Sequence, residues 1–327
     1  MGYNKANYKR IREEYATKTF RAQAEADVRR EELYAAIPEL RELDGRLNRF
    51  GLRIMQAALN GSDTAAEVAA LQRENQEIKA YRGELLRKNG FPADYSEPKY
   101  DCEACKDTGY VGIRMCSCMR RSLIEAGMES SGLSQLMQTQ SFENFSTDYY
   151  REDARVYRIM CDNFNRVKAY ARDFTLENGN HPQSMLFLGG TGLGKTHLST
   201  AVARTVIERG YDVFYNSAVG MLSDFEYRRF GNGLVQNEGD DTARYTECDL
   251  LILDDLGTEV VNQFTLSCLY YVINTRLNLK KPTVISTNLL SSDLRKIYGD
   301  RIASRLMGEY TVFSFCGVDV RKQKLQG

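Results

Sequence analysis

The stretch Gly189-Gly190-Thr191-Gly192-Leu193-Gly194-Lys195-Thr196 decides the fold of this chain. It matches G-x-x-x-x-G-K-[ST] in full, and it lies between an apolar run, Met185–Leu188, and a helical pattern that begins at His197. Glycines allow backbone N–H groups to approach a phosphate, and the helix that follows adds the positive end of its dipole. We expect Lys195 to reach the β- and γ-phosphates of a nucleotide and Thr196 to ligate Mg²⁺.

A second apolar run, Leu250–Leu253, ends in two carboxylates, Asp254 and Asp255. At a strand end beside the phosphate loop, Asp254 is expected to hold Mg²⁺, usually through water. Asp255 stands where a water-activating glutamate is common. Because its side chain is one methylene shorter than that of glutamate, we expect ATP hydrolysis to be slow.

Two further segments carry polar residues that suit a phosphate site. The run Thr283–Ser286 is followed closely by Asn288, whose amide is expected to orient the attacking water or contact the γ-phosphate. In Gly299-Asp300-Arg301-Ile302-Ala303-Ser304-Arg305, the two arginines are four residues apart, on one face of a short helix. A guanidinium at a subunit edge stabilises charge on a neighbour's γ-phosphate, while surface salt bridges are the alternative role.

Strand-like and helical patterns alternate from about residue 150 onward. This alternation predicts an α/β fold with a parallel sheet covered by helices on both faces. We assign residues 141–327 to this domain. Its expected strands are Met185–Leu188, Val213–Asn216, Leu250–Leu253, Thr283–Ser286 and Thr311–Phe315.

Residues 1–91 are rich in charged residues, alanine and leucine, and they predict about three helices, with breaks at Pro38 and at Asn60-Gly61. An antiparallel helical hairpin is one possible arrangement. These helices have only a narrow row of apolar residues. Such a stripe indicates either a surface on which a partner docks or a bundle of helices exposed to solvent. The residues of that stripe in the last helix are Val68, Leu71, Ile78 and Leu85, interrupted by Asn75 and Arg82.

Residues 92–140 contain four clustered cysteines, Cys102, Cys105, Cys116 and Cys118. Four thiolates in so short a span suit tetrahedral Zn²⁺, and the turn Asp107-Thr108-Gly109 lets the two arms fold together. An iron–sulfur centre and free thiols are the alternatives. A helix is expected from about Arg120 to Leu136.

Composition places few further limits on the chain. Its 327 residues include 44 Lys and Arg and 44 Asp and Glu, so nucleic-acid binding requires a local basic patch. The first fifteen residues lack the apolar core of a signal peptide, and no run approaches the ~18 apolar residues of a membrane span. A soluble, cytoplasmic protein without membrane contact is expected.

Four features together resemble the AAA+ ATPases of the clade that contains initiator DnaA and the helicase loaders DnaC and DnaI. They are the phosphate loop, the strand that ends in Asp254 and Asp255, the segment Gly299–Arg305 with its two arginines, and Asn288, which corresponds to the sensor residue of these ATPases. The phrases G-K-T-H-L at 194–198 and L-D-D-L-G at 253–257 are typical of the loaders and of the IstB transposition helpers. The resemblance covers roughly residues 142–324. It implies an AAA+ domain without a C-terminal helical lid.

The resemblance also implies roles for individual residues. Arg305 corresponds to the arginine finger, which a neighbouring subunit supplies, so the family implies self-association into a spiral. Arg321, in the closing segment Gly317–Arg321, corresponds to a nucleotide contact, and His197 adds another beside the loop. The family also implies contact with single-stranded DNA on a helix between the second and third strands. Here that helix is Ala218–Phe230, which offers Tyr227, Arg228 and Arg229, and a solvated amphipathic helix is the alternative.

The sequence is consistent with three functions. The leading hypothesis is an ATP-dependent loader of the hexameric replicative helicase onto single-stranded DNA, with ATP as a switch for assembly and release. The DnaI-type loaders carry an N-terminal zinc module, whereas the IstB helpers generally do not, and this favours the loader. An IstB-like transposition helper and a P-loop adaptor without meaningful turnover are the alternatives.

Overall fold

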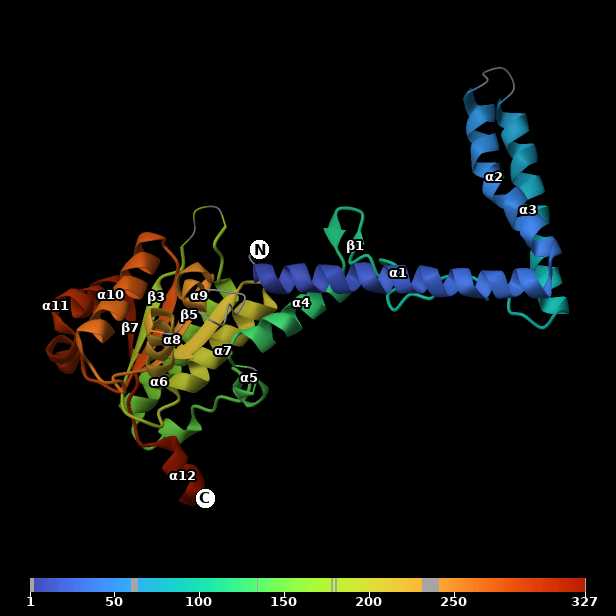
Figure 1. Cartoon of the computed structure of the whole chain (residues 1–327). Helices are drawn as coiled ribbons and strands as arrows, with labels where there is room; N and C mark the ends of the chain where they lie inside the picture. The colour runs from blue at the N-terminus through green and yellow to red at the C-terminus, as the bar shows by residue number, and fades with distance from the viewer. Residues whose placement is uncertain are drawn as a thin grey trace. The chain divides into compact units, whose positions relative to one another are not determined.

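A computed structural model describes residues 3–59, 64–133, 135–177, 179, 181–230 and 241–326. The chain divides into two compact units (Figure 1). One unit combines Met1–Ile11 with Arg120–Gly327, and the other is Arg12–Met119. The P-loop lies in the first, which we call the nucleotide unit, and the four clustered cysteines lie in the second, which we call the arm unit.

The nucleotide unit is built on a five-stranded parallel sheet, as the alternating pattern predicts. The strand order is β4-β5-β6-β3-β7. The strand before the phosphate loop, β3, therefore lies between β6 and β7, and β6 separates it from the strand with the two carboxylates, β5. The strands are β3 (Ser184–Leu188), β4 (Val213–Ser217), β5 (Leu250–Leu256), β6 (Thr283–Thr287) and β7 (Tyr310–Ser314).

Helices cover both faces of this sheet (Figure 1). Side chains alternate between the faces along each strand, so Met185 and Phe187 join one core while Leu186 joins the other. The first core contains residues of α6 (Ala154–Asp173) and α7 (Lys195–Glu208). The second contains residues of α8 (Ala218–Phe230), α9 (Asp241–Glu247), α10 (Gln263–Asn278) and α11 (Ser291–Glu309).

The helix expected from Arg120 to Leu136 is the main error in the predicted elements. The structure has α4 (Ser117–Ser130) and then a separate short helix, α5 (Leu136–Thr139). Gly132 has a φ of 83°, which a right-handed helix does not accommodate. There the chain turns onto the edge strand β4, where the Tyr215 N–H donates to the Ser131 carbonyl at 2.9 Å. A tertiary contact ends the helix, and no helical pattern reveals it.

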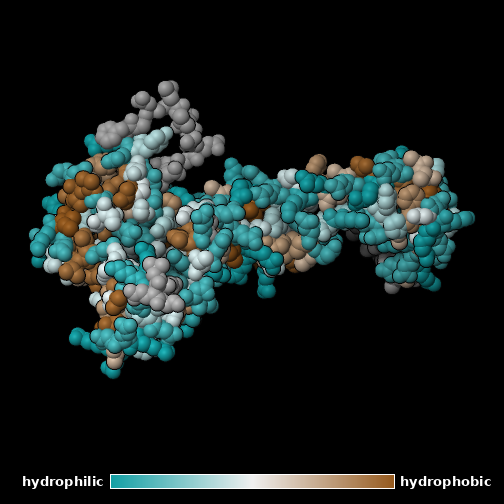
Figure 2. Space-filling model, turned by 90° about the horizontal axis from the view of Figure 1, so that it is seen from below, coloured by the Kyte–Doolittle hydropathy of each residue, from teal (hydrophilic) through white to brown (hydrophobic). Residues whose placement is uncertain are grey.

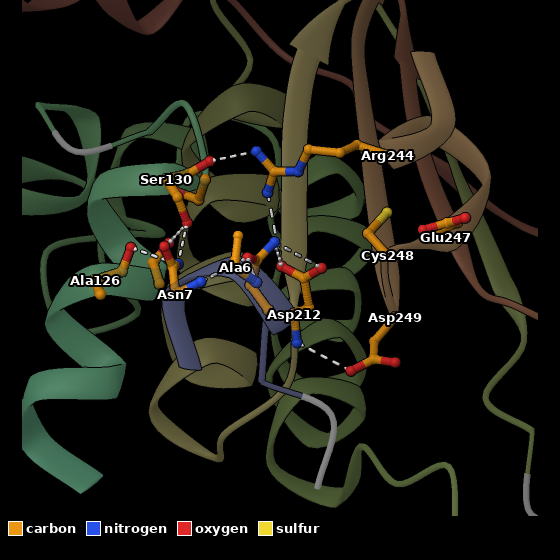
Figure 3. A network of polar contacts seen from close by, with 12 residues as sticks. Ala6, Asn7, Ala126, Ser130, Asp212, Arg244, Glu247, Cys248 and Asp249 are labelled. Carbon is orange, nitrogen blue, oxygen red and sulfur yellow. Dashed lines mark hydrogen bonds and ion pairs between the residues drawn. The ribbon is translucent and has the colours of Figure 1, made fainter. Parts of the chain in front are cut away.

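The first two turns of α1 (Lys5–Ala36) belong to the nucleotide unit. Figure 3 shows Asn7 directed at α4, where its amide donates to the Ser130 hydroxyl at 2.7 Å and to the Ala126 carbonyl at 3.0 Å. Arg244 donates to the Ser130 carbonyl at 2.9 Å and lies 3.6 Å from an oxygen of Asp212, just before β4. Residues distant in sequence thus fix the beginning of α1 on the sheet edge.

The arm unit contains the rest of α1 together with α2 (Glu39–Leu59) and α3 (Thr64–Lys88), which confirms the three predicted helices. Tyr81 donates to Glu39 and Arg46 pairs with Glu74, so α2 and α3 are antiparallel. The expected break at Pro38 is confirmed, whereas Asn60-Gly61 lies outside the described residues.

A small apolar core joins the three helices of the arm unit. Leu71 and Ile78 are buried in it and Leu85 packs against it, whereas the side chain of Val68 lies outside the described residues. Arg82, which interrupts the predicted stripe, pairs with the partly buried Asp44 at 2.7 Å. The interruption is therefore a partly buried ion pair between α2 and α3.

The surface of the two units is mixed in polarity. Figure 2 shows hydrophobic residues scattered over the nucleotide unit, at the left of the view, and a largely hydrophilic surface on the arm unit. In the part of the chain that the structure describes, no helix combines the length and apolar character needed to cross a bilayer.

Candidate functional site: a nucleotide site and a four-cysteine centre

The phosphate loop connects β3 to α7, as the motif predicts. Its geometry requires glycine at several positions, of which two lie against the chain after β7. Gly189 has a φ of 153°, and a Cβ there would lie 2.3 Å from the Phe315 carbonyl oxygen. Gly192 has a φ of 72°, and its Cβ would lie 1.8 Å from a carboxylate oxygen of Asp319. The loop is therefore packed against the chain that follows β7.

Lys195 and Asn288 are brought together at the ends of neighbouring strands. The Lys195 ammonium donates to the Asn288 Oδ1 at 2.7 Å and to the carbonyls of Gly189 and Gly190 at 2.7 and 2.6 Å. Burial lowers the pKa of Lys195 because the charged form loses water. The predicted sensor residue therefore lies within hydrogen-bonding reach of the phosphate-loop lysine.

Asp254 is buried, with only 2% of its surface exposed, and three hydroxyl groups surround its carboxylate. Thr196 and Tyr215 both donate to Oδ2 at 2.9 Å, and Ser286 donates to Oδ1. Thr196 and Asp254 are the residues predicted to hold Mg²⁺. A set of hydroxyl and carboxylate oxygens suits a hard cation, so the residues present fit that ion.

Asp255 differs from its neighbour in backbone and in environment. Its φ of 53° is rare for a residue other than glycine. The pairing of β5 with β6 is irregular between Leu253 and Leu256, so the strand does not end at the carboxylates but passes through them. Burial raises the pKa of Asp255, and the Asp254 carboxylate adds to this effect.

A cavity of about 390 Å³ lies over the phosphate loop. Most of the residues predicted to contact nucleotide line this cavity. Its lining residues come from segments near both ends of the domain. Among the residues that line it are Thr191, Gly192, Leu193, Gly194, Lys195, Thr196, His197, Asp255, Asn288 and Arg321.

The opposite wall of the cavity comes from residues 136–150, which the sequence did not mark as a nucleotide contact. Phe145 packs edge-on against His197 with ring centroids 5.2 Å apart, and the Tyr150 hydroxyl donates to the Leu193 carbonyl at 3.0 Å. His197 also contacts the Ser141 carbonyl at 2.8 Å. The aromatic residues of Ser141–Phe145 were the available signal, but only the fold places them beside the loop.

The segment after β7 closes another side of the cavity. The Val320 N–H donates to the Gly192 carbonyl at 3.0 Å, where α12 (Val320–Gln326) begins. Asp319 accepts a hydrogen bond from the Arg321 N–H at 2.9 Å. Arg321 lines the cavity.

Arg305 lies outside the group of described residues that line this cavity. Its guanidinium donates to Asn274 Oδ1 at 3.0 Å and to the Tyr270 hydroxyl at 2.9 Å, and it lies 4.6 Å from the centroid of the Tyr270 ring. Arg301 lines a second cavity, of about 290 Å³, between α10 and α11. The positive φ of Gly299 divides α11, so the predicted short helix with both arginines is its second half.

The helix α8 has the bounds that the sequence predicts, Ala218–Phe230. Tyr227, Arg228 and Arg229 are exposed near its end. Arg228 donates to the Thr242 hydroxyl on α9, and the guanidinium of Arg229 lies 5.4 Å from the centroid of the Phe264 ring. Both arginines are thus held on the protein with their surfaces open to solvent.

The four clustered cysteines of the arm unit converge on one point. Their sulfur atoms all lie within 4.8 Å of one another, with Cys102 and Cys116 at 3.8 Å and Cys105 and Cys118 at 3.4 Å. A tetrahedron with Zn–S bonds of about 2.3 Å has sulfur atoms about 3.8 Å apart. The cage therefore fits one ion.

A short hairpin of β1 (Tyr110–Val111) and β2 (Arg114–Met115) joins the two arms of this centre. The Cys116 N–H donates to the Gly109 carbonyl at 2.8 Å. The buried Asp107 accepts from the N–H groups of Asp101 and Cys102, both at 2.9 Å. The Cys118 N–H lowers the pKa of the Cys116 thiol to about 7, whereas burial raises the pKa of the Cys105 and Cys118 thiols.

Comparison with known proteins relates this site to a family. Residues 167–322 match the model of the family "IstB-like ATP binding protein". The replicative helicase loader DnaC of Escherichia coli (strain K12) is 26% identical over 178 residues, which are 54% of this chain and 66% of DnaC. The phage-like element PBSX protein XkdC of Bacillus subtilis (strain 168) is 27% identical over 235 residues, which are 68% of this chain and 83% of XkdC.

A crystal structure of the DnaC helicase loader aligns with 56% of this chain and 99% of that chain, at 18% identity and a TM-score of 0.46. The chain spans just under two thirds of the length of the E. coli loader it matches. With its phosphate loop, its parallel sheet and these sequence matches, the nucleotide unit is similar to the ATP-binding domains of the IstB-like family and of the loader DnaC.

Proposed function

We propose that this protein loads a hexameric replicative helicase onto single-stranded DNA, with ATP acting as a switch between assembly and release. The observation that carries the proposal is the similarity to the E. coli replicative helicase loader. The three hydroxyl groups around the Asp254 carboxylate, and the Lys195–Asn288 contact, support ATP and Mg²⁺ as the ligands of the cavity.

Within this proposal, each residue of the site has one role. Lys195 neutralises the β- and γ-phosphates, and Thr196 and Asp254 hold Mg²⁺. Asp255 activates water and Asn288 orients it. Because the Asp255 carboxylate is short and partly buried, turnover is slow until partners bind. Hydrolysis then serves as a timed release step.

Arg305 acts on the nucleotide of a neighbouring subunit. Its place on α11, away from the cavity of its own chain, supports this assignment. Arg305 lies on α11 and contacts α10. Each of these helices has an exposed hydrophobic residue, Tyr271 on α10 and Met307 on α11, which supports contact between this part of the surface and another protein. ATP would therefore join subunits, and its loss would separate them.

The remaining assignments follow the division of the chain that the sequence suggests. Residues 1–91 dock on the helicase, residues 92–140 form a structural zinc module and a linker, and residues 141–327 form the ATPase domain. The cysteine cage is complete with four protein ligands, so the ion stabilises structure and leaves no position open for catalysis. Single-stranded DNA lies along α8, where Tyr227 offers a ring for stacking and Arg228 and Arg229 offer phosphate contacts.

Co-purification with the replicative helicase of the same organism tests the proposal. Tagged full-length protein is expected to retain the helicase with ATP and to release it when ATP is hydrolysed. Lys195→Ala is the matched variant, because it removes the ammonium that binds phosphate and so should lose the ATP dependence. Retention of a transposase in place of the helicase would favour the IstB-like alternative, and retention of neither would reject the loader.

A further inference from the structure

One of the three hydroxyl groups that donate to Asp254 comes from a residue outside the predicted magnesium site. Thr196 belongs to the phosphate-loop motif, and Ser286 lies on the neighbouring strand β6. The third donor, Tyr215, comes from β4, the edge strand of the sheet, and reaches Oδ2 at 2.9 Å. Nothing in the phosphate-loop motif or the Asp-Asp motif specifies this tyrosine.

The position of Tyr215 explains how it reaches the carboxylate. On β4, Tyr215 is paired with Ile252 of β5, two residues before Asp254. Its side chain packs against the core on the α6 and α7 face, the same face from which Thr196 approaches. Backbone contacts fix the strand here, because the Tyr215 N–H donates to Ser131 and the Tyr215 carbonyl lies against Gly132.

The Thr196 and Tyr215 contacts differ in what they do when an ion binds. The Thr196 oxygen is shared between Asp254 and the proposed magnesium ligand sphere, so its contact depends on the ion. The Tyr215 hydroxyl is not a proposed magnesium ligand, so its contact with Asp254 does not depend on the ion in this way. Without Tyr215, Ser286 would still hold the Asp254 carboxylate at Oδ1. Because the terminal torsion of an aspartate is broad, a carboxylate held at that oxygen alone would sample several orientations.

We propose that Tyr215 is a positioning residue for Mg²⁺, whose hydroxyl holds the Asp254 carboxylate in the orientation that the ion requires. The inference rests on the proposed function, since it assumes that the cavity binds nucleotide with Mg²⁺. Tyr215 is not among the described residues that line the cavity. It acts through the hydrogen bond to Asp254, and buried charge-assisted bonds of this kind are among the stronger ones.

The test measures nucleotide binding as a function of Mg²⁺. A fluorescent ATP analogue is titrated into full-length protein with EDTA and then at increasing Mg²⁺. In Tyr215→Phe, the Mg²⁺ concentration for half-maximal enhancement of binding is expected to rise about tenfold, the size of one lost hydrogen bond to a charged group. Binding in EDTA is expected to match that of the unsubstituted protein, because the phosphate loop is unchanged.

Tyr211→Phe is the matched control. Tyr211 is buried in the same core, two residues before β4, and the substitution removes the same atom from it. This control should leave the Mg²⁺ dependence unchanged. If Tyr215→Phe also leaves it unchanged, the positioning role is rejected. If Tyr215→Phe instead weakens binding equally with and without Mg²⁺, the tyrosine supports the fold alone, and the proposal is again rejected.

A second measurement separates this proposal from the proposed function. In an Asp254→Asn background, Tyr215→Phe should cause no further change in Mg²⁺ dependence, because the group through which it acts is already altered. Additive effects would show that Tyr215 acts by another route. If the unsubstituted protein binds the analogue without any response to Mg²⁺, the proposed function fails before any variant is compared.

Discussion

At the residue scale, two adjacent carboxylates have different surroundings. Asp254 is buried beneath three hydroxyl donors, while Asp255 lines the cavity from a backbone conformation that few residues other than glycine adopt. The irregular pairing between β5 and β6 produces this difference, because it turns the strand between Leu253 and Leu256. Strained backbone of this kind often occurs at functional sites.

Asp255 is therefore the residue on which turnover should depend. We expect Asp255→Ala to lower ATP turnover by about 10²–10⁴-fold, the usual contribution of a general base, with nucleotide affinity nearly unchanged. Phosphate release and binding of a fluorescent nucleotide measure the two quantities. Asp162→Ala on α6, which removes an exposed acid, is the control. Turnover at the unsubstituted rate in Asp255→Ala would remove the residue from the mechanism.

At the element scale, one buried guanidinium joins several elements. Arg276 of α10 is fully buried and donates to the Tyr245 and Cys248 carbonyls near the end of α9. It also donates to the Pro282 carbonyl and the Thr283 hydroxyl at the start of β6. A buried charge is tolerated only when such partners surround it.

Removing this side chain should destabilise the nucleotide unit. Arg276→Met leaves several carbonyls without a donor, so we expect the free energy of unfolding to fall by about 3–5 kcal/mol. Urea unfolding followed by circular dichroism measures the change. Arg204→Met, at a partly exposed ion pair on α7, should change it by less than about 0.5 kcal/mol. Equal midpoints for the two variants would contradict this account of Arg276.

The helix α8 carries a separate prediction. We expect the double variant Arg228→Ala/Arg229→Ala to lose most of its affinity for single-stranded DNA, and the salt dependence of the remaining binding to be shallower. Fluorescence anisotropy with a labelled oligonucleotide at two salt concentrations measures both effects. Arg120→Ala/Arg121→Ala removes the same charge from α4 and should leave binding intact. Equal loss in both double variants would indicate a nonspecific charge effect.

At the scale of the whole molecule, the proposed finger requires two subunits. Lys195→Ala and Arg305→Ala should each abolish turnover when tested alone. Mixed in equal amounts, they should recover roughly one quarter of full activity, since random pairing places an intact lysine beside an intact arginine at about one interface in four. Phosphate release measures the recovery. No recovery in the mixture, with each variant folded, would argue that Arg305 does not act between subunits.

The two units should also respond differently to loss of metal. We expect about one zinc ion per chain and no visible absorbance, and we expect Cys102→Ser/Cys116→Ser to abolish zinc binding. Nucleotide binding should survive, because the phosphate loop lies in the other unit. Cys161→Ser, on α6, should retain the zinc. Near-stoichiometric iron with visible absorbance would reject the zinc assignment, and joint loss of nucleotide binding would reject the independence of the units.

The sequence by itself determined the parts of this protein that depend on neighbours along the chain. The phosphate loop, the five strands, the helix Ala218–Phe230 and the three N-terminal helices each rest on local spacing and composition, and the structure contains them within a few residues. The parallel sheet followed from alternation alone. The four cysteines also converge as their spacing predicts.

Only the tertiary structure decided which distant residues meet. Tyr215 reaches Asp254, Phe145 packs on His197, and Ser131 ends α4 by pairing with β4. No local pattern specifies these contacts, because each joins segments brought together by the order of strands in the sheet. The path of β5 through Asp254 and Asp255 also depends on its pairing with β6. Local sequence patterns identified the candidate ligands, and long-range packing set the orientation of their side chains.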